Sequence, residues 1–407
     1  NKLKINPMNY FKYYAIIIFS LMPYVVNVTP YSSDKNTPPF SIIAYYVPEE
    51  HYNPENLPLD KLTHIIFSFT KVIDNEMKFQ NKDYGKKLKK LVAQRKNHPN
   101  LKVMIACGGW GSKGFSDMAY TPESRHKFVN SVVQFNKTYQ LDGIDIDWEY
   151  PTIPAAGTKG RPEDKQNFTL LMKELRKALN SLKRNQTLTF ASAGWERYYD
   201  NVEINEVLKY ADYMNVMTYD QTSGSSPFTG HHTPLGWIKN DDLKQSPEYS
   251  VIETRKKELA QLGYDYELRS ANKIINYCKN LGVKPEQIII GAAFYGRAWQ
   301  GVPPKNNGLY QPNKGPYIGW SAYSQIRKEF ETNNNYKRYW DSIASAPYLY
   351  SAKDSIFISY DDTVSVRLKT NYALKNKLGG IMFWQLGNDT KEKNNFLDAI
   401  YKESTKY

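Results

Sequence analysis

The sequence predicts an α/β fold: a (β/α)8 TIM barrel with a small α+β insertion between strands 7 and 8. Three observations predict it. Short β-rich segments recur along the chain, helical patterns fill most of the intervals between them, and one long interval breaks this rhythm. An open doubly wound sheet is the alternative. It usually has fewer strands and would need a glycine-rich phosphate loop after the first strand, which is absent here.

Eight segments have the composition of buried strands, rich in β-branched and aromatic residues. They are FSIIAYYV (40–47), HIIFSFT (64–70), KVMIACGG (102–109), GIDIDWEY (143–150), TLTFASAG (187–194), YMNVMTYD (213–220), QIIIGAAFYG (287–296) and GGIMFWQL (379–386). Apolar residues recur at helical spacing in the intervals, as in 124–139 and 164–182. Strands that alternate with helices in this way predict a parallel barrel closed on itself.

The interval between the seventh and eighth strands is too long for a plain βα loop. Its mixed strand and helix signals predict a separate α+β insertion domain at 299–357. The barrel is then expected to consist of residues 36–298 and 358–407.

Residues 1–35 differ from the rest of the chain. Lysines precede the short apolar run AIIIFSLM (15–22), which is too short to span a bilayer comfortably. A basic head followed by such a run is typical of a signal peptide, although an N-terminal anchor remains an alternative. We therefore predict a secreted, extracellular protein.

The composition is that of a globular protein, with 41% hydrophobic and 23% charged residues. The net charge is +13, but the basic residues are scattered and form no dense run, so we expect a solvated surface and no nucleic-acid partner. The two cysteines, Cys107 and Cys278, exclude a disulfide framework and a cysteine-based zinc site.

The segment LDGIDIDWEYP (141–151) places acids in a strand that otherwise has a buried composition. Because side chains alternate along a strand, Asp145, Asp147 and Glu149 share one face, whereas Asp142 faces the other way and is expected to be structural. Glu149 lies nearest the C-terminal end of the strand, where barrel active sites are found.

Three neighbouring carboxylates cannot all ionise cheaply, so at least one is expected to hold a proton near neutral pH. A protonated acid beside other carboxylates suits the protonation of a leaving oxygen in glycoside hydrolysis. A divalent-metal site and a set of structural ion pairs are the alternatives, but no histidine accompanies the acids.

The motif DGIDIDWEYP resembles the D-x-x-D-x-D-x-E signature of glycoside hydrolase family 18, the chitinases. Further segments resemble the family in the expected order from about residue 40 to 402: AYYVP, LTHIIFSF, CGGW, VMTYD, FYGRAW, PYLY, FISYDD and GGIMFWQLGND. The resemblance identifies the insertion as the α+β chitinase insertion domain of one branch of the family.

The resemblance implies a role for each acid. Glu149 matches the proton donor, Asp147 the acid that orients the N-acetyl group of the substrate, and Asp145 the acid behind it that shares a proton. Tyr219 matches the hydroxyl that hydrogen-bonds the acetamido group. The nucleophile is then the acetamido oxygen of the substrate, so the reaction passes through an oxazolinium intermediate and retains configuration.

The resemblance also implies a set of substrate-binding residues along the groove. They are Tyr45, Phe67, Trp110, Tyr150, Met217, Asp220, Tyr295, Arg297 and Trp384. One departure concerns the third strand, where Ala106 stands in place of a serine that is common in the family and hydrogen-bonds the innermost acid.

These observations predict a secreted, monomeric chitinase that hydrolyses β-1,4 bonds between N-acetylglucosamine residues, with endo cleavage favoured and no metal or cofactor. A non-catalytic chitin-binding lectin of the same fold is one alternative, although such members usually lose the terminal glutamate. An endo-β-N-acetylglucosaminidase acting on glycoprotein glycans is the other.

Overall fold

The computed structural model describes residues 40–48, 53–263, 268–318 and 322–406. The N-terminal segment that the sequence assigns to a signal peptide or anchor, residues 1–35, lies outside the described residues. In the part of the chain that is described, no helix is both long and apolar enough to cross a membrane.

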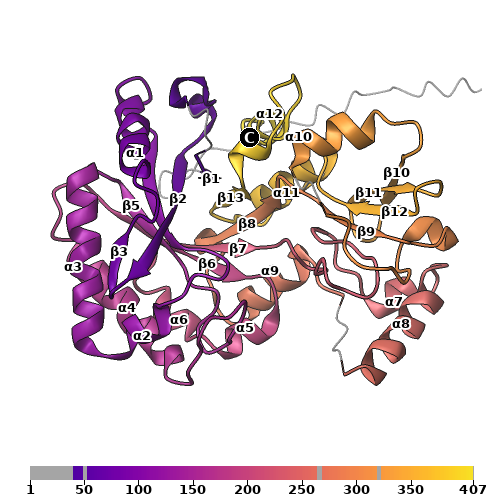
Figure 1. The fold of residues 1–407 in the computed structure, drawn as a ribbon, viewed down its shortest axis with the longest axis horizontal. Helices are drawn as coiled ribbons and strands as arrows, with labels where there is room; N and C mark the ends of the chain where they lie inside the picture. The colour runs from indigo at the N-terminus through magenta and orange to yellow at the C-terminus, as the bar shows by residue number, and fades with distance from the viewer. Residues whose placement is uncertain (1–39, 49–52, 264–267, 319–321, 407) are drawn as a thin grey trace, which may run out of the picture. The chain divides into compact units, whose positions relative to one another are not determined.

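Eight parallel strands form a closed barrel, in which β1 pairs with β2 on one side and with β13 on the other. The barrel strands are β1 (Ser41–Tyr46), β2 (His64–Ile73), β4 (Lys102–Gly108), β5 (Gly143–Asp147), β6 (Thr187–Ala193), β7 (Tyr213–Met217), β8 (Ile288–Ala293) and β13 (Gly380–Trp384). A short strand, β3 (Glu76–Lys78), pairs antiparallel with the end of β2. The predicted TIM barrel is therefore confirmed (Figure 1).

Helices follow most of the barrel strands and cover the outside of the barrel (Figure 1). They are α1 (Tyr84–Ala93), α2 (Phe115–Tyr120), α3 (Pro122–Tyr139), α4 (Asp164–Leu179), α5 (Glu196–Asp200), α6 (Ile204–Val207), α9 (Ala271–Asn280), α11 (Thr363–Lys375) and α12 (Phe396–Ser404). The helix expected over 124–139 begins at Pro122 because Thr121 and Ser124 form a capping box.

A second, antiparallel sheet has the strand order β10-β11-β12-β9. Its strands are β9 (Arg297–Gln300), β10 (Lys337–Asp341), β11 (Ala346–Ser351) and β12 (Ile356–Ser359), and the short helix α10 (Tyr323–Ile326) lies between β9 and β10. Two neighbouring strands of this sheet, β9 and β12, extend across the limits that the sequence suggests for the insertion, 299 and 357.

Among the described residues, the core consists of three separate groups of buried side chains. The largest fills the layer between the barrel and its helices. A second, small group fills the inside of the barrel and includes Tyr45 and Met104. The third joins the second sheet to α7 (Asn240–Leu243) and α8 (Tyr249–Gln261), because Ile252 packs in one cluster with Trp299 and Phe357.

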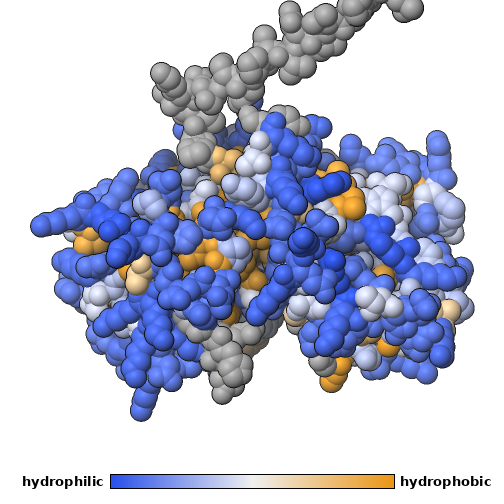
Figure 2. All heavy atoms as spheres, turned by 90° about the horizontal axis from the view of Figure 1, so that it is seen from above, coloured by the Kyte–Doolittle hydropathy of each residue, from blue (hydrophilic) through white to orange (hydrophobic). Residues whose placement is uncertain are grey.

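The face of the molecule shown in Figure 2 is largely hydrophilic, with hydrophobic side chains gathered towards its middle. This matches the high content of charged residues, 54 lysines and arginines against 41 acids.

Candidate active site

The acids of β5 point into the barrel, and the residues between them point out of it. Asp145 and Asp147 are buried, whereas Ile144 and Ile146 belong to the layer beneath the helices. The alternation continues past the end of the strand, where Trp148 stacks on Phe115 with ring centroids 5.4 Å apart. Glu149, on the inward side, is half-buried and is therefore the accessible acid of the row.

Asp145 is fully buried and accepts hydrogen bonds from the side chains of three other strands. The donors are the Tyr45 hydroxyl at 2.9 Å, the Thr189 hydroxyl at 2.6 Å and the Asn215 amide at 3.0 Å. Burial raises the pKa of Asp145 to about 6, although these donors oppose the rise. These three donors stabilise the charged form of Asp145.

Asp147 and Glu149 are both shifted toward the protonated form. The pKa of Asp147 is raised well above its usual range by burial and by the charges of Glu149 and Asp145. Burial raises the pKa of Glu149 to about 7, with a hydrogen bond from Tyr150 acting in the opposite direction. One oxygen of Asp147, Oδ1, has no hydrogen-bond partner among the described residues. These acids can therefore share or donate a proton near neutral pH.

Asp142 lies on the other face of the segment, as its odd spacing predicts. It forms ion pairs with Arg95 at 2.8 Å and Arg184 at 2.9 Å, and it accepts a hydrogen bond from the backbone of Val103. These contacts fasten the start of β5 to its neighbours.

Across the barrel mouth from β5, residues that follow β7 and β8 form a second wall. The Arg297 guanidinium donates to Asp220 at 2.7 Å. Although burial opposes the shift, His232 and Arg297 hold the pKa of Asp220 well below its usual range, so Asp220 stays ionised. Tyr219 and Tyr295 pack edge to face, 5.9 Å apart. The sequence alone assigns no role to His232, because no local pattern shows that it lies beside Asp220.

Trp384, at the end of β13, lies between two other aromatic rings. Phe69 stacks on it at a centroid distance of 5.4 Å with an interplanar angle of 22°, and Tyr45 lies 5.9 Å away on a tilted plane. A flat apolar surface of this kind suits the C–H faces of a sugar.

The prediction that Phe67 lines the groove is wrong. Phe67 is fully buried on the outside of the barrel, where it packs edge-on against Tyr84 and Phe79. Its neighbour Ile66 points inward, so Phe67 must point outward. The register of β2 shifts between Phe67 and Thr70, and this irregularity turns Phe69 inward instead. Phe69 is the aromatic residue that the sequence reading missed.

The remaining predicted residues lie around these walls. Met217 and Tyr219 border the inner core of the barrel. Tyr150 is buried between Trp110, at 6.4 Å, and Trp195, at 4.9 Å. Trp110 is 65% exposed, which is unusual for a tryptophan and leaves its ring free to contact a ligand.

The described residues contain no group of three or more histidine, cysteine, aspartate or glutamate side chains arranged to hold a metal ion. The alternative of a divalent-metal site at the acid row therefore has no ligand set in this part of the chain.

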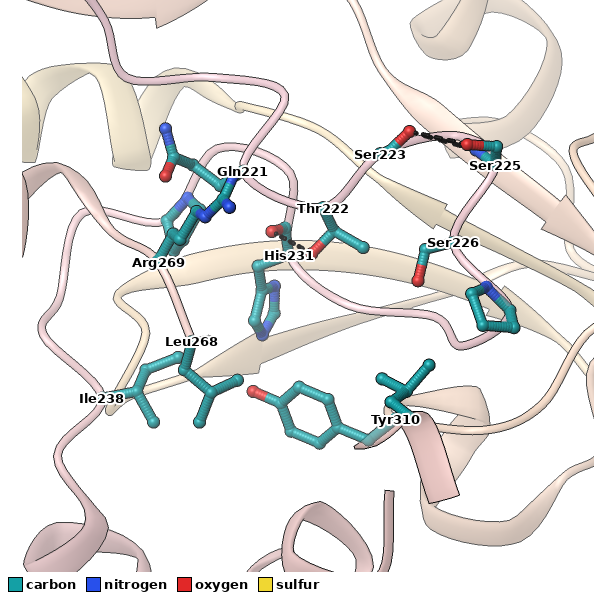
Figure 3. Close-up of a pocket in the computed structure, with 13 residues that line it drawn as sticks. Gln221, Thr222, Ser223, Ser225, Ser226, His231, Ile238, Leu268, Arg269 and Tyr310 are labelled. Carbon is teal, nitrogen blue, oxygen red and sulfur yellow. Dashed lines mark hydrogen bonds between the residues drawn. The ribbon is translucent and has the colours of Figure 1, made fainter. Parts of the chain in front are cut away.

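A separate cavity of about 200 Å³ is lined in part by the loop that begins at Gln221 (Figure 3). The loop 221–226 and His231 form its polar side, and Ile238, Leu268 and Tyr310 form much of its apolar side. His231 is held by Asp341 at 2.9 Å. None of the side chains predicted to bind substrate lines this cavity.

Residues 41–389 match the model of the family Glycosyl hydrolases family 18. Chitinase A1 of Niallia circulans is 36% identical over 307 residues, an alignment that covers 72% of this chain but only 42% of that protein. Chitinase B of Serratia marcescens is 30% identical over 381 residues, covering 81% of this chain and 74% of the relative.

A solved structure of a family 18 N-acetylglucosaminidase from Paenibacillus barengoltzii has a similar fold. The TM-score is 0.76 at 34% identity, and the match covers 89% of this chain and 99% of the other. Chitinase ChiA74 of Bacillus thuringiensis matches with a TM-score of 0.79 at 26% identity, over 90% of this chain and 70% of the other.

Proposed function

The chain belongs to glycosyl hydrolase family 18, and from this premise we propose that it hydrolyses the β-1,4 bonds between N-acetylglucosamine residues of chitin and chito-oligosaccharides by a retaining, substrate-assisted mechanism. The observation that carries the proposal is the placement of Glu149. It ends the row of inward-facing acids, it is accessible while Asp145 and Asp147 are buried, and its pKa is raised to about 7.

In this mechanism Glu149 donates its proton to the glycosidic oxygen as the bond breaks. The acetamido oxygen of the substrate attacks the anomeric carbon, and an oxazolinium ion forms. Asp147 holds the acetamido N–H, and the Tyr219 hydroxyl, which lies 3.7 Å from the Met382 sulfur, donates to the acetamido group. Glu149 then takes a proton from the water that opens the ring.

Asp145 acts behind Asp147. Three donors stabilise the charge of Asp145, so Asp145 is ionised while Asp147 carries the shared proton of the pair. When the charge on the acetamido group changes, the proton can pass to Asp145, which becomes neutral as Asp147 ionises. Trp384 and Phe69 support the sugar on the non-reducing side of the cut, and the ionised Asp220–Arg297 pair borders the opposite wall.

We further propose endo cleavage by a secreted monomer. The exposed ring of Trp110 supports this, since it offers a platform for sugars outside the acid row. The basic, apolar N-terminal pattern supports secretion.

The test is hydrolysis of chitohexaose, with the anomers of the first products followed by NMR. Retention of the β configuration and the release of internal fragments are expected. A partially deacetylated substrate serves as the control, because substrate assistance requires an acetylated sugar on the non-reducing side of every cut. Inversion would contradict the mechanism.

The likeness to the P. barengoltzii N-acetylglucosaminidase favours a second candidate, the stepwise release of single sugars. Product profiles at early times separate the two, because single-sugar release gives only the monosaccharide and a chain shorter by one. Cleavage of a glycoprotein glycan without cleavage of chitohexaose would instead favour an endo-β-N-acetylglucosaminidase. Binding of chitin without any turnover would favour a lectin.

The activity is expected to fall as the pH rises. Glu149 must be protonated to act as an acid, and burial raises its pKa to about 7. We therefore expect kcat/KM to decrease about tenfold for each pH unit above about 7. A pH series with chitotetraose measures this, with unfolding followed in parallel by circular dichroism. A profile that is flat to pH 9 in folded protein would contradict the assignment of Glu149.

The two phenylalanines of β2 give a matched pair of variants. Phe69→Ala removes the ring stacked on Trp384, so we expect kcat/KM to fall about tenfold. The loss of stability should be smaller than in Phe67→Ala, because Phe69 is only half-buried. Phe67→Ala leaves a cavity under the helices and is expected to cost about 3–5 kcal/mol of stability. Its activity per folded molecule should be close to wild type. Equal losses of activity in the two variants would contradict the inward placement of Phe69.

A further inference from the structure

Lys71, on β2, lies beside the acid row. Its ammonium donates a hydrogen bond of 2.6 Å to the carbonyl of Gly108, the last residue of β4. Gly108 is the register partner of Asp147 on β5. The approach of these strand ends is so close that a Cβ on Gly108 would lie 1.9 Å from the carbonyl oxygen of Asp147. The contact of Lys71 is thus with the residue directly beside the second acid of the row.

The same ammonium lies over the ring of Phe69, 5.2 Å from its centroid. Two further neighbours of this ring are Trp384, which stacks on it, and Gly109, where a Cβ would come within 2.9 Å of the ring. Lys71 therefore clamps Phe69 between the end of β4 and the tryptophan at the end of β13. A cation over an aromatic face contributes attraction that increases as water is excluded.

The groups on which the charge of Lys71 acts differ in their own charge. Its positive charge acts on Asp147 and Glu149 of the acid row and on Cys107 of β4. Burial raises the pKa of the Cys107 thiol to about 12, so this group is neutral.

On β3 the register partner of Lys71 is Lys78. Lys78 is paired with Glu76 at 2.6 Å and lies 3.8 Å from Asp74. Its charge is therefore compensated locally, whereas the charge of Lys71 is directed at the carboxylates of the acid row.

The other charged or titratable groups that face the acids carry a negative charge or none. Asp220 and the hydrogen-bonding Tyr150 face Glu149, and Asp145 faces Asp147. Three tyrosines, Tyr45, Tyr198 and Tyr219, also lie near Asp147, and burial raises the pKa of each phenol well above its usual range, so all three are neutral. Within the described ranges, Lys71 is thus the cation that offsets the mutual repulsion of the acids.

We propose that Lys71 is a positioning residue for the glycosidase reaction, which holds Phe69 against Trp384 and places a positive charge beside Asp147 and Glu149. This inference rests on the proposed function. It concerns two properties of that reaction: the pH range in which Glu149 carries the proton, and the fit of the sugar on the aromatic surface.

The test compares Lys71→Met, Lys71→Arg and the control Lys78→Met. Removal of the cation raises the pKa of Glu149, and the acid form is the active one, so the basic limb of kcat/KM moves to higher pH in Lys71→Met. We expect a shift of about half a pH unit or more. The KM for chitotetraose is expected to rise about threefold as the Phe69 ring loses its clamp. Lys71→Arg should retain the wild-type limb, and Lys78→Met should match wild type in both respects.

A Lys71→Met profile that superimposes on wild type would overturn the inference, and so would an equal shift in Lys78→Met. Failure of the proposed function is distinguishable, because the wild-type enzyme itself would then not cleave chitotetraose. In that case the carboxyl ¹³C shift of Glu149, titrated in wild type and in Lys71→Met, measures the same displacement without turnover. A titration midpoint that does not move between the two proteins would overturn the inference there.

Discussion

Glu149→Gln is expected to lower kcat on chito-oligosaccharides by about 10³-fold, within the range of about 10²–10⁴ that a positioned general acid contributes. The amide has nearly the shape of the carboxyl group but cannot donate its proton to the leaving oxygen. It also cannot take a proton from water in the second step, so both halves of the reaction are slowed.

The substitution should leave folding and binding largely intact, because Glu149 is half-buried at a strand end and forms no ion pair with another residue in the described part of the chain. A suitable control is Glu163→Gln, an exposed acid in the same connection between β5 and α4. In Glu149→Gln, turnover of chitotetraose should fall while its binding, followed by tryptophan fluorescence, is retained. In the control, both turnover and binding should match wild type. Similar turnover by wild type and Glu149→Gln would remove the basis of the proposed mechanism.

The barrel could be predicted because each of its strands leaves a local signal. Residues such as Ile144 and Ile146 alternate with Asp145 and Asp147, and this period of two survives in the structure without interruption. The acid row could be placed for the same reason, and its end at the barrel mouth follows from the direction of a parallel strand.

The error at Phe67 shows where this reasoning ends. The alternation of side chains between the two faces of a strand holds only where the pairing with the neighbouring strand is regular. The pairing of β2 is irregular between Phe67 and Thr70, and the composition of HIIFSFT does not reveal this. The inward aromatic is consequently Phe69. Lys71, two residues further on, was also overlooked, since only the closed barrel brings its ammonium to the Gly108 carbonyl on β4.

The third core is another feature that no local pattern could predict. Ile252 of α8 and Trp299 of β9 pack in one cluster, although α8 precedes β8 and only the segment 299–357 is predicted to leave the barrel as an insertion. A contact of this kind depends on how distant segments meet, and the periodicity of each segment says nothing about its partner.

Lys369→Met is expected to cost about 3–5 kcal/mol of the free energy of unfolding, the usual result of removing one partner from a buried ion pair. Lys369 and Asp361 are fully buried, and the ammonium lies 2.7 and 2.9 Å from the two carboxylate oxygens. The carboxylate also accepts from the backbone of Ala293 and from Thr233. The Lys369–Asp361 pair thereby joins α11 to the end of β8 and to the loop after β7. These two elements lead into the wall of the site that contains Asp220 and Arg297.

Urea denaturation measures the loss, and Lys375→Met, an exposed lysine at the end of the same helix, is the matched control with an expected change below about 0.5 kcal/mol. The double variant Lys369→Met/Asp361→Asn should be more stable than Lys369→Met alone, because the uncompensated charge is gone while the amide oxygen still accepts from Ala293. Additive losses in the double variant would mean that the two side chains stabilise the fold independently, and the wall of the site would then owe its position to packing alone.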